Sequence, residues 1–225
     1  MEYLDTISLP RSTDTYTPVP HTEVITTLLN ESSSMGLEVL DSRYALRKQG
    51  KQLFISITLA GSRSKAYEWS LVGINSYDKT LALRLGGGLN TKVCTNQSLS
   101  GDYCYYHKHT KGVSLKDGAT VVLSQLPSAC EALEITLDAM KVPITKAQGA
   151  YFLLIWGESI PLSNKNIYRA LELWEAPMYP EFTPYGNQVY GLYQAVTYLC
   201  KEWPDNRKYP LLQSLASTIE GWVWI

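Results

Sequence analysis

Apolar and polar residues alternate along much of the first half of the chain. In Gln52–Leu59, Leu53, Ile55, Ile57 and Leu59 alternate with polar positions such as Ser56 and Thr58, which predicts a half-buried strand. The same reading applies to Tyr67–Asn75 and Thr80–Leu85, and the polar residues Ser76–Lys79 between them suit a hairpin turn. Gly86–Gly88 interrupts the pattern. We expect a bulge or flexible turn there, because no phosphate-loop signature accompanies the glycines.

In other segments, before and after these strands, apolar residues recur at the helical period. An early helix is predicted over His21–Met35, ended by Gly36. Further strands are expected at Thr91–Thr95, Tyr103–His109 and Ala119–Ser124. The later helices are expected at Ser128–Lys141, Lys165–Glu175, Asn187–Trp203 and Leu211–Trp222. Their apolar stripes are typical of a packed core rather than of a cofactor site.

This order of elements predicts an α+β fold, with an antiparallel sheet flanked by helices and a helical C-terminal half. Residues 1–20 contain three prolines and are expected to form an extended arm. Residues 21–127 would form a helix and a sheet with a basic face. Residues 128–225 would be mainly helical and pack on that sheet, giving one domain overall.

Composition narrows the class of protein. Apolar residues make up 45% of the 225 residues and charged residues 18%, which excludes wholesale disorder. No apolar run approaches the roughly 18 residues of a membrane span, and the N-terminus lacks the apolar region of a secretory signal. Four cysteines without paired spacing favour reduced thiols. We therefore expect a cytoplasmic protein.

The net charge of −1 conceals an asymmetry along the chain. Residues 43–116 carry 12 Lys or Arg and 3 Asp or Glu, a net charge of +9, whereas the rest of the chain carries −10. Such a segment indicates a local anion-binding surface, although an ordinary solvated sheet face would show the same excess.

Aromatic residues are interleaved with these cations, as in proteins that bind single-stranded nucleic acid. The predicted nucleic-acid contacts are Arg84, Lys92, Tyr103, Tyr105, Tyr106, Lys108 and Lys111. On a strand, Tyr103, Tyr105, His107 and His109 would share one face, and Cys104, Tyr106 and Lys108 the other. The alternative is that the tyrosines simply pack in the core.

Other chemistry has weaker support. Cys94, Cys104, His107 and His109 are candidate zinc ligands, but Cys104 is predicted on the opposite strand face from the histidines, so we expect no metal and no cofactor. No hydrolase, zinc-protease or paired-carboxylate signature is present, and an enzyme is the minority interpretation.

Several short segments resemble the phage- and plasmid-borne family of unknown function DUF932. They are Tyr16–His21, Asn75–Arg84, Val93–Asn96, His109–Thr110 and Tyr190–Thr197. Gln97 departs from that family, in which a small residue is expected. Within the second segment, the family-motif turn comprises Asn75, Ser76, Tyr77, Asp78 and Lys79. By looser analogy, the resemblance implies a fold related to Rad52-type annealing proteins.

These observations predict a phage- or plasmid-derived protein that binds single-stranded DNA in replication, recombination or repair, with homo-oligomers expected as one mode of assembly. The alternative is a non-enzymatic protein that binds a host protein or nucleotide and counters host defence. Neither interpretation includes a membrane partner.

Overall fold

A computed structural model describes residues 2–64, 67–91, 94–159, 162–201 and 203, and the positions 211, 214, 215, 218, 219 and 221. For residues 2, 5, 90, 91, 94–104, 159 and 181 the description covers the backbone alone. The chain divides into two compact units. The first comprises Met1–Asn90 and Leu99–Glu131, and the second Thr91–Ser98 and Ala132–Ile225.

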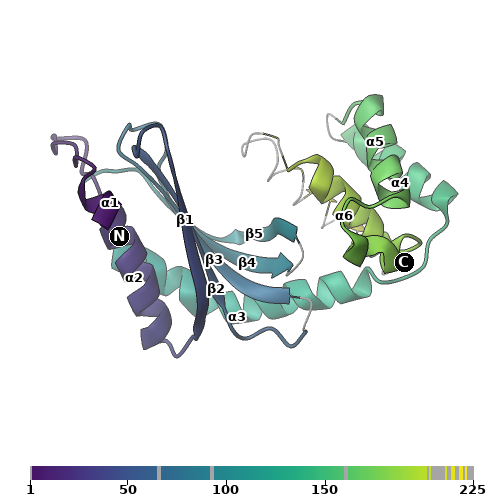
Figure 1. Cartoon of the computed structure of the whole chain (residues 1–225), viewed down its shortest axis with the longest axis horizontal. Helices are drawn as coiled ribbons and strands as arrows, with labels where there is room; N and C mark the ends of the chain where they lie inside the picture. Colours follow the sequence, from purple (N-terminus) through teal and green to yellow (C-terminus); the bar gives the residue numbers. More distant parts are fainter. Residues whose placement is uncertain are drawn as a thin grey trace. The chain divides into compact units, whose positions relative to one another are not determined.

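The first unit is built on a five-stranded antiparallel sheet with the strand order β1-β2-β3-β4-β5 (Figure 1). The strands are β1 (Val39–Arg47), β2 (Gln52–Leu59), β3 (Tyr67–Ser76), β4 (Leu83–Thr91) and β5 (Cys94–His107). Each strand pairs with the strand that precedes it in the chain. The predicted α+β class, with an antiparallel sheet and a helical C-terminal half, is confirmed.

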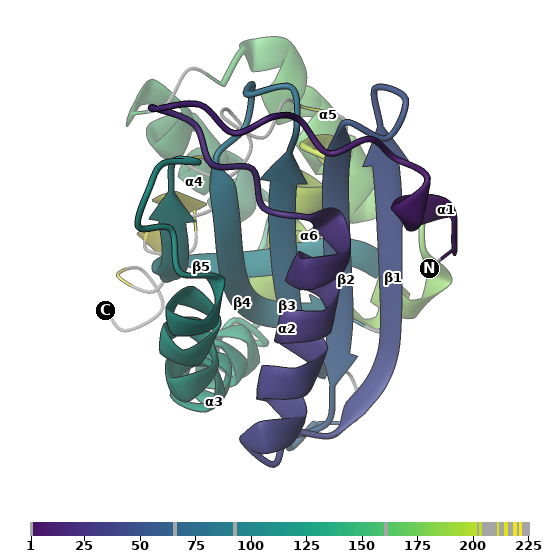
Figure 2. The same cartoon turned by 90° about the vertical axis from the view of Figure 1, so that its left-hand side faces the viewer.

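Helices cover one face of this sheet. The apolar residues Leu53, Ile55, Ile57 and Leu59 of β2 are buried on that face, as the alternation predicted. Figure 2 shows α2 (His21–Ser34) and α3 (Leu115–Ala139) lying in front of the strands. Helix α2 buries Val24, Ile25 and Leu28, which recur at helical spacing.

Two glycines allow the helices to approach the strands closely. A Cβ atom at Gly73 of β3 would lie 3.1 Å from Leu28 Cδ1 of α2, and one at Gly87 of β4 would overlap Leu126 Cδ1 of α3. Gly86–Gly88 lies inside β4, so the alternative of a flexible turn is wrong, whereas the alternative of a bulge stays a prediction. Glycine serves here as a strand residue because a helix side chain occupies the space above it.

Helix α3 corrects one further prediction and agrees with another. The predicted strand Ala119–Ser124 lies in the first half of α3, and the predicted helix Ser128–Lys141 largely coincides with its second half. The buried residues Ala119, Val122, Leu123 and Leu126 are spaced as on one helix face. The predicted domain boundary at residue 127 therefore falls within a helix.

Strand boundaries differ in the same part of the chain. The strand predicted at Thr80–Leu85 begins only at Leu83, because residues 77–82 form the connecting loop. The strand predicted at Thr91–Thr95 is divided between the end of β4, at Thr91, and the start of β5, at Cys94, with residues 92 and 93 outside the described residues. The strand predicted at Tyr103–His109 falls largely within β5, which ends at His107.

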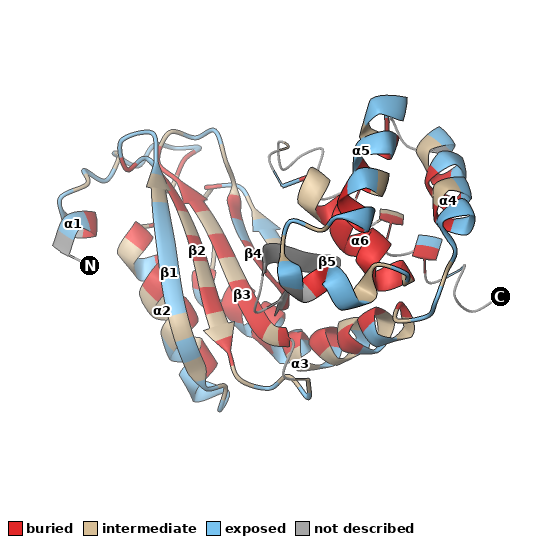
Figure 3. Cartoon of the chain, turned by 45° about the vertical axis from the view of Figure 1, so that its right-hand side comes forward, coloured by how far each residue is buried: buried red, intermediate tan, exposed pale blue. Residues whose placement is uncertain are grey.

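Apart from the strand residues at 91 and 94–98, the described part of the second unit is mainly helical. It contains α4 (Lys146–Ser159), α5 (Asn164–Glu175), the 3-10 helix η1 (Pro180–Tyr185) and α6 (Val189–Leu199), and α6 is buried along most of its length (Figure 3). The Ser163 side chain caps α5 by accepting a hydrogen bond from the Asn166 N–H. The helices predicted at Lys165–Glu175 and Asn187–Trp203 are confirmed, whereas most of Leu211–Trp222 lies outside the described residues. Among the described helices, none has the length and apolar character needed to cross a membrane.

Candidate functional site

Arg84 and Tyr106, two of the predicted contact residues, lie together. The Arg84 Cζ atom is 5.3 Å from the centre of the Tyr106 ring, and Tyr106 is 55% exposed. Arg84 lies between Leu83 and Leu85, which are buried on the helix-covered face, so its side chain projects from the opposite face. Arg84 and Tyr106 thus place a cation over an exposed aromatic ring on this face, and their role as nucleic-acid contacts stays a prediction.

A second cation and ring lie on the same face. Arg47, the last residue of β1, places its Cζ atom 4.7 Å from the centre of the Phe54 ring. Phe54 pairs with Ile74 of β3, and both are half-buried. We call Arg47, Phe54, Ile74, Arg84 and Tyr106 the outer platform. It presents rings and guanidinium planes on the sheet face away from α2 and α3.

The other predicted contacts are distributed differently. Tyr105 lies on the helix-covered face, where its ring fills the space beside Gly118 of α3 and stacks with His107 at 6.0 Å. Lys108 and Lys111 are exposed just after β5. Lys92 and the Tyr103 side chain lie outside the described residues. Strand alternation thus places Tyr105 and Tyr106 on opposite faces, and only Tyr106 belongs to the outer platform.

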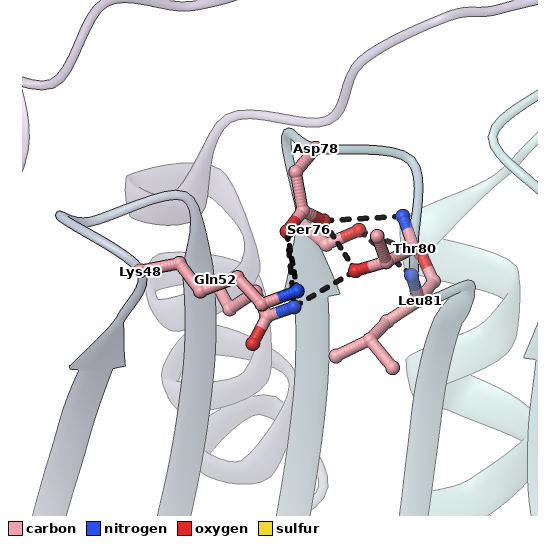
Figure 4. Close-up of polar contacts among 6 residues, drawn as sticks. All are labelled: Lys48, Gln52, Ser76, Asp78, Thr80 and Leu81. Carbon is pink, nitrogen blue, oxygen red and sulfur yellow. Dashed lines mark hydrogen bonds and ion pairs between the residues drawn. The ribbon is translucent and has the colours of Figure 1, made fainter.

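The family-motif turn is organised by Asp78, as Figure 4 shows. Its carboxylate accepts hydrogen bonds from the Thr80 N–H and hydroxyl at 3.1 and 2.5 Å, and from Lys48 Nζ and Gln52 Nε2 at 3.1 Å each. Burial raises the pKa of Asp78, but the bonds from Thr80 and Lys48 and the charge of Lys48 outweigh it and lower the pKa to about 2. Asp78 therefore joins the loops that follow β1 and β3.

Ser76 fixes the other side of the same loop. Its hydroxyl donates to the Leu81 carbonyl at 2.8 Å and accepts from the Leu81 N–H at 3.1 Å (Figure 4). Lys79 has a φ of +62°, and its Nζ lies 4.6 Å from the centre of the Tyr16 ring. Ser76, the last residue of β3, and Asp78 thus hold the loop 77–82 in place through their side chains, and the predicted turn Asn75–Lys79 begins two residues too early.

Beneath the turn lies a buried polar cluster formed by Tyr16, His21, Asn75, Tyr77 and His109. The His21 and Tyr77 rings stack with their centres 3.8 Å apart, and the Tyr77 hydroxyl accepts a hydrogen bond from the backbone N–H of His21 at 2.7 Å. Asn75 Nδ2 donates to the Val19 carbonyl at 2.7 Å. Sequence reasoning assigned no role to Tyr16 or His21 and considered His109 only as a candidate zinc ligand, although all three fall within the segments that resemble DUF932.

The contacts of His21 define its protonation state. Asn75 Nδ2 lies 2.9 Å from Nδ1, and because an amide nitrogen only donates, Nδ1 must accept. Nε2 must then carry the proton that it donates to the Gly50 carbonyl, 3.0 Å away. Burial lowers the pKa of His21; the Gly50 bond opposes this shift, and the nearby His109 adds to it. His21 is therefore a neutral imidazole that joins α2 to the turn between β1 and β2.

His109 is buried without such bonds. Neither of its ring nitrogens has a described partner in good hydrogen-bond geometry. Burial lowers the pKa of His109; the nearby Leu81 backbone opposes this shift, and His107 adds to it. The ring packs against Tyr16 at 5.7 Å, and the His109 carbonyl accepts from the Thr17 N–H at 2.9 Å. His109 thus fastens the N-terminal arm to the end of β5.

The candidate zinc set is not assembled by the described side chains. No group of three or more His, Cys, Asp or Glu among them could hold a metal ion. The side chains of Cys94 and Cys104 lie outside the described residues, so the expected absence of zinc stays a prediction.

The fold and the site define a class of protein: an antiparallel sheet with helices on one face and a cationic, aromatic platform on the other. Comparison with known families assigns it more closely. The model of the domain of unknown function DUF932 matches residues 9–208, and the chain belongs to this family. No curated protein and no solved structure matches the chain, so the analogy to Rad52-type proteins stays a prediction.

Segments that carry the family resemblance meet in this site. Tyr16–His21, Asn75–Arg84 and His109–Thr110 are far apart in the sequence, yet they supply every member of the buried polar cluster and Arg84 of the outer platform. The cluster holds the loops in place, and Arg47, Arg84 and Tyr106 of the platform are exposed.

Proposed function

We propose that this protein binds single-stranded nucleic acid, with single-stranded DNA as the principal ligand, in the replication, recombination or repair of a phage or plasmid. The Arg84 guanidinium over the exposed Tyr106 ring carries the proposal. Arg47 over Phe54 repeats this combination on the same sheet face. Such side chains stack on unpaired bases, and their charges attract the phosphates.

The excess of positive charge supports the same ligand. The +9 segment identified in the sequence supplies Arg47 and Arg84 of the platform and the exposed Lys108 and Lys111 beside it. Bases of a duplex are already stacked and paired, so an aromatic platform favours a single strand. The protein would act in the cytoplasm of the cell that carries the phage or plasmid.

The test is binding of a fluorescein-labelled oligothymidylate of about 15 nucleotides, followed by fluorescence anisotropy. Tyr106→Ala should weaken binding by about 5- to 150-fold, which corresponds to the loss of one base stack. Tyr168→Ala is the matched control, because Tyr168 is a 70% exposed tyrosine on α5 of the second unit. Its affinity should equal that of the wild type.

Two results would contradict the proposal. One is the absence of binding by the wild type at about 50 mM salt, where electrostatic attraction is strongest. The other is an equal loss of affinity in Tyr106→Ala and Tyr168→Ala. Under the first result, capture of a host protein becomes the better explanation of the exposed platform.

A further inference from the structure

Four segments of the first unit come together at one end of the sheet. In an antiparallel sheet every second connection lies at the same end, so residues 48–51, 77–82 and 108–114 are neighbours in space. The arm predicted over residues 1–20 begins instead with the short helix α1 (Glu2–Asp5), and its remaining part, residues 6–20, crosses this end (Figure 2). Ile7 lies against Gly50, and Thr17 bonds to His109. We call these four segments the loop end of the sheet.

The loop end concentrates cations that have no acidic partner. Arg11, Lys51, Lys79, Lys108 and Lys111 are all exposed, and none forms an ion pair with a described residue. The four segments hold six cations and two carboxylates, Asp14 and Asp78, so their net charge is +4. One of these carboxylates, Asp78, is already paired with Lys48.

Most other described cations of this unit are paired with acids. Arg43 pairs with Asp41, Arg63 with Glu131 and Lys116 with Glu31. The remaining ones, Arg47 and Arg84, belong to the outer platform and lie at the ends of β1 and β4 that adjoin the loop end. Within the described part of this unit, unpaired positive charge is therefore confined to one end of the sheet.

The buried polar cluster fixes the segments that carry these cations. His21 bonds to Gly50 in the turn between β1 and β2, and Asn75 bonds to Val19 of the arm. The His109 carbonyl holds Thr17, and the Lys79 ammonium lies over the Tyr16 ring. Bonds of this kind reduce the entropy that a loop loses when a ligand binds, which favours affinity.

We propose that the loop end is a phosphate-binding track that runs across the strands, from the turn between β1 and β2 to the turn after β5. This inference rests on the proposed function, and it assigns the backbone of the single strand to the lysines of the loop end and its bases to the outer platform. Lys51 and Lys111 mark the two ends of the track. They are separated by about 3.5 strand spacings, or roughly 17 Å, which corresponds to about five stacked nucleotides.

The test measures how the affinity for the labelled oligothymidylate of about 15 nucleotides depends on salt. Lys51→Ala and Lys111→Ala should each flatten the slope of log K against log salt by about 0.7, and the double variant by about 1.4. An oligothymidylate of about three nucleotides is too short to reach both ends of the track, so on it the two effects should not add. Lys165→Ala is the matched control, because Lys165 is exposed on α5 and has no ion pair among the described residues.

The outcomes separate the track from the proposed function. If Tyr106→Ala weakens binding while both lysine variants behave like Lys165→Ala, the track is wrong and single-strand binding stands. If Lys165→Ala flattens the slope as much as the other two, overall charge rather than the loop end attracts the DNA, and the track is again wrong. If the wild type binds no oligothymidylate at about 50 mM salt, both proposals fail.

Discussion

Asp78 is the residue whose removal should most disturb the loop end. Asp78→Ala deletes an acceptor of four hydrogen bonds, two of them with Thr80, and should lower the free energy of unfolding by roughly 1–3 kcal/mol in urea titrations at neutral pH. Asp41→Ala, which removes a 45% exposed carboxylate from a surface ion pair, should cost no more than about 1 kcal/mol.

The contribution of Asp78 should also depend on pH. Its pKa is about 2 in the folded protein and 3.8 ordinarily, so the folded state binds this proton less readily than the unfolded state. Stability from Asp78 is therefore present above pH 3.8 and is lost as the pH falls towards 2. If the Asp78→Ala variant keeps full stability but loses DNA binding, Asp78 contacts the ligand rather than holding the loop in place.

His21 and His109 should make the protein less stable in mild acid. Burial lowers both pKa values below the ordinary 6.5, so the unfolded chain takes up protons that the folded chain resists. Their contribution is complete above pH 6.5 and decreases as the pH falls below it. Urea titrations at about pH 7.5 and at about pH 5.5 should show this loss in the wild type and a smaller one in His109→Phe.

The two histidines should differ at neutral pH. His21→Phe leaves the Gly50 carbonyl and one of the two Asn75 amide N–H groups without their partner, at a cost of roughly 1–3 kcal/mol. His109→Phe removes ring nitrogens that have no well-formed hydrogen bond and should be close to neutral. Equal costs in the two variants would show that His109 makes a polar contact as strong as those of His21.

At the scale of the elements, the contact between β4 and α3 depends on Gly87. Gly87→Ala places a methyl group against Leu126 Cδ1 in a core that is already filled, and should lower the free energy of unfolding by about 1–3 kcal/mol. Leu126→Ala opens a cavity at the same point and should cost about 2–5 kcal/mol alone.

A double-mutant cycle tests whether these two residues share one space. In the double variant, the methyl group introduced at position 87 occupies part of the cavity left by truncating Leu126, so the double variant should be more stable than the sum of the two single effects predicts. Additive effects would mean that α3 moves away from β4 when Gly87 is replaced.

At the scale of the whole molecule, the salt dependence of DNA binding counts the phosphates that the protein neutralises. The four cations singled out in the sequence, Arg84, Lys92, Lys108 and Lys111, give an expected slope of about −3. The five loop-end cations together with Arg47 and Arg84 give about −5. A titration of the wild type from about 50 mM salt upwards distinguishes the two values. Loss of the Tyr106 ring should lower affinity with little change in slope.

The sequence determined the features that depend on neighbouring residues. Alternation in Gln52–Leu59 defined a strand with one buried face, and the polar residues of Ser76–Lys79 defined a turn. The same alternation put Tyr105 and Tyr106 on opposite faces of β5, although it left open which face a ligand could reach. These properties follow from backbone geometry and local hydrogen bonds, which short stretches of sequence specify.

Tertiary structure decided the rest, because the deciding contacts join residues far apart in the chain. Gly86–Gly88 is part of a strand because Leu126, which lies in α3, takes the space above Gly87. His21, Asn75 and His109 form one cluster because α2, β3 and the end of β5 meet there. The charge total of residues 43–116 indicated an anion-binding surface, but only strand order brings Lys51, Lys79 and Lys111 to one end of the sheet, while folding pairs Arg43, Arg63 and Lys116 with acids elsewhere. Composition records how many charges a segment has, and the fold determines which of them remain available to a ligand.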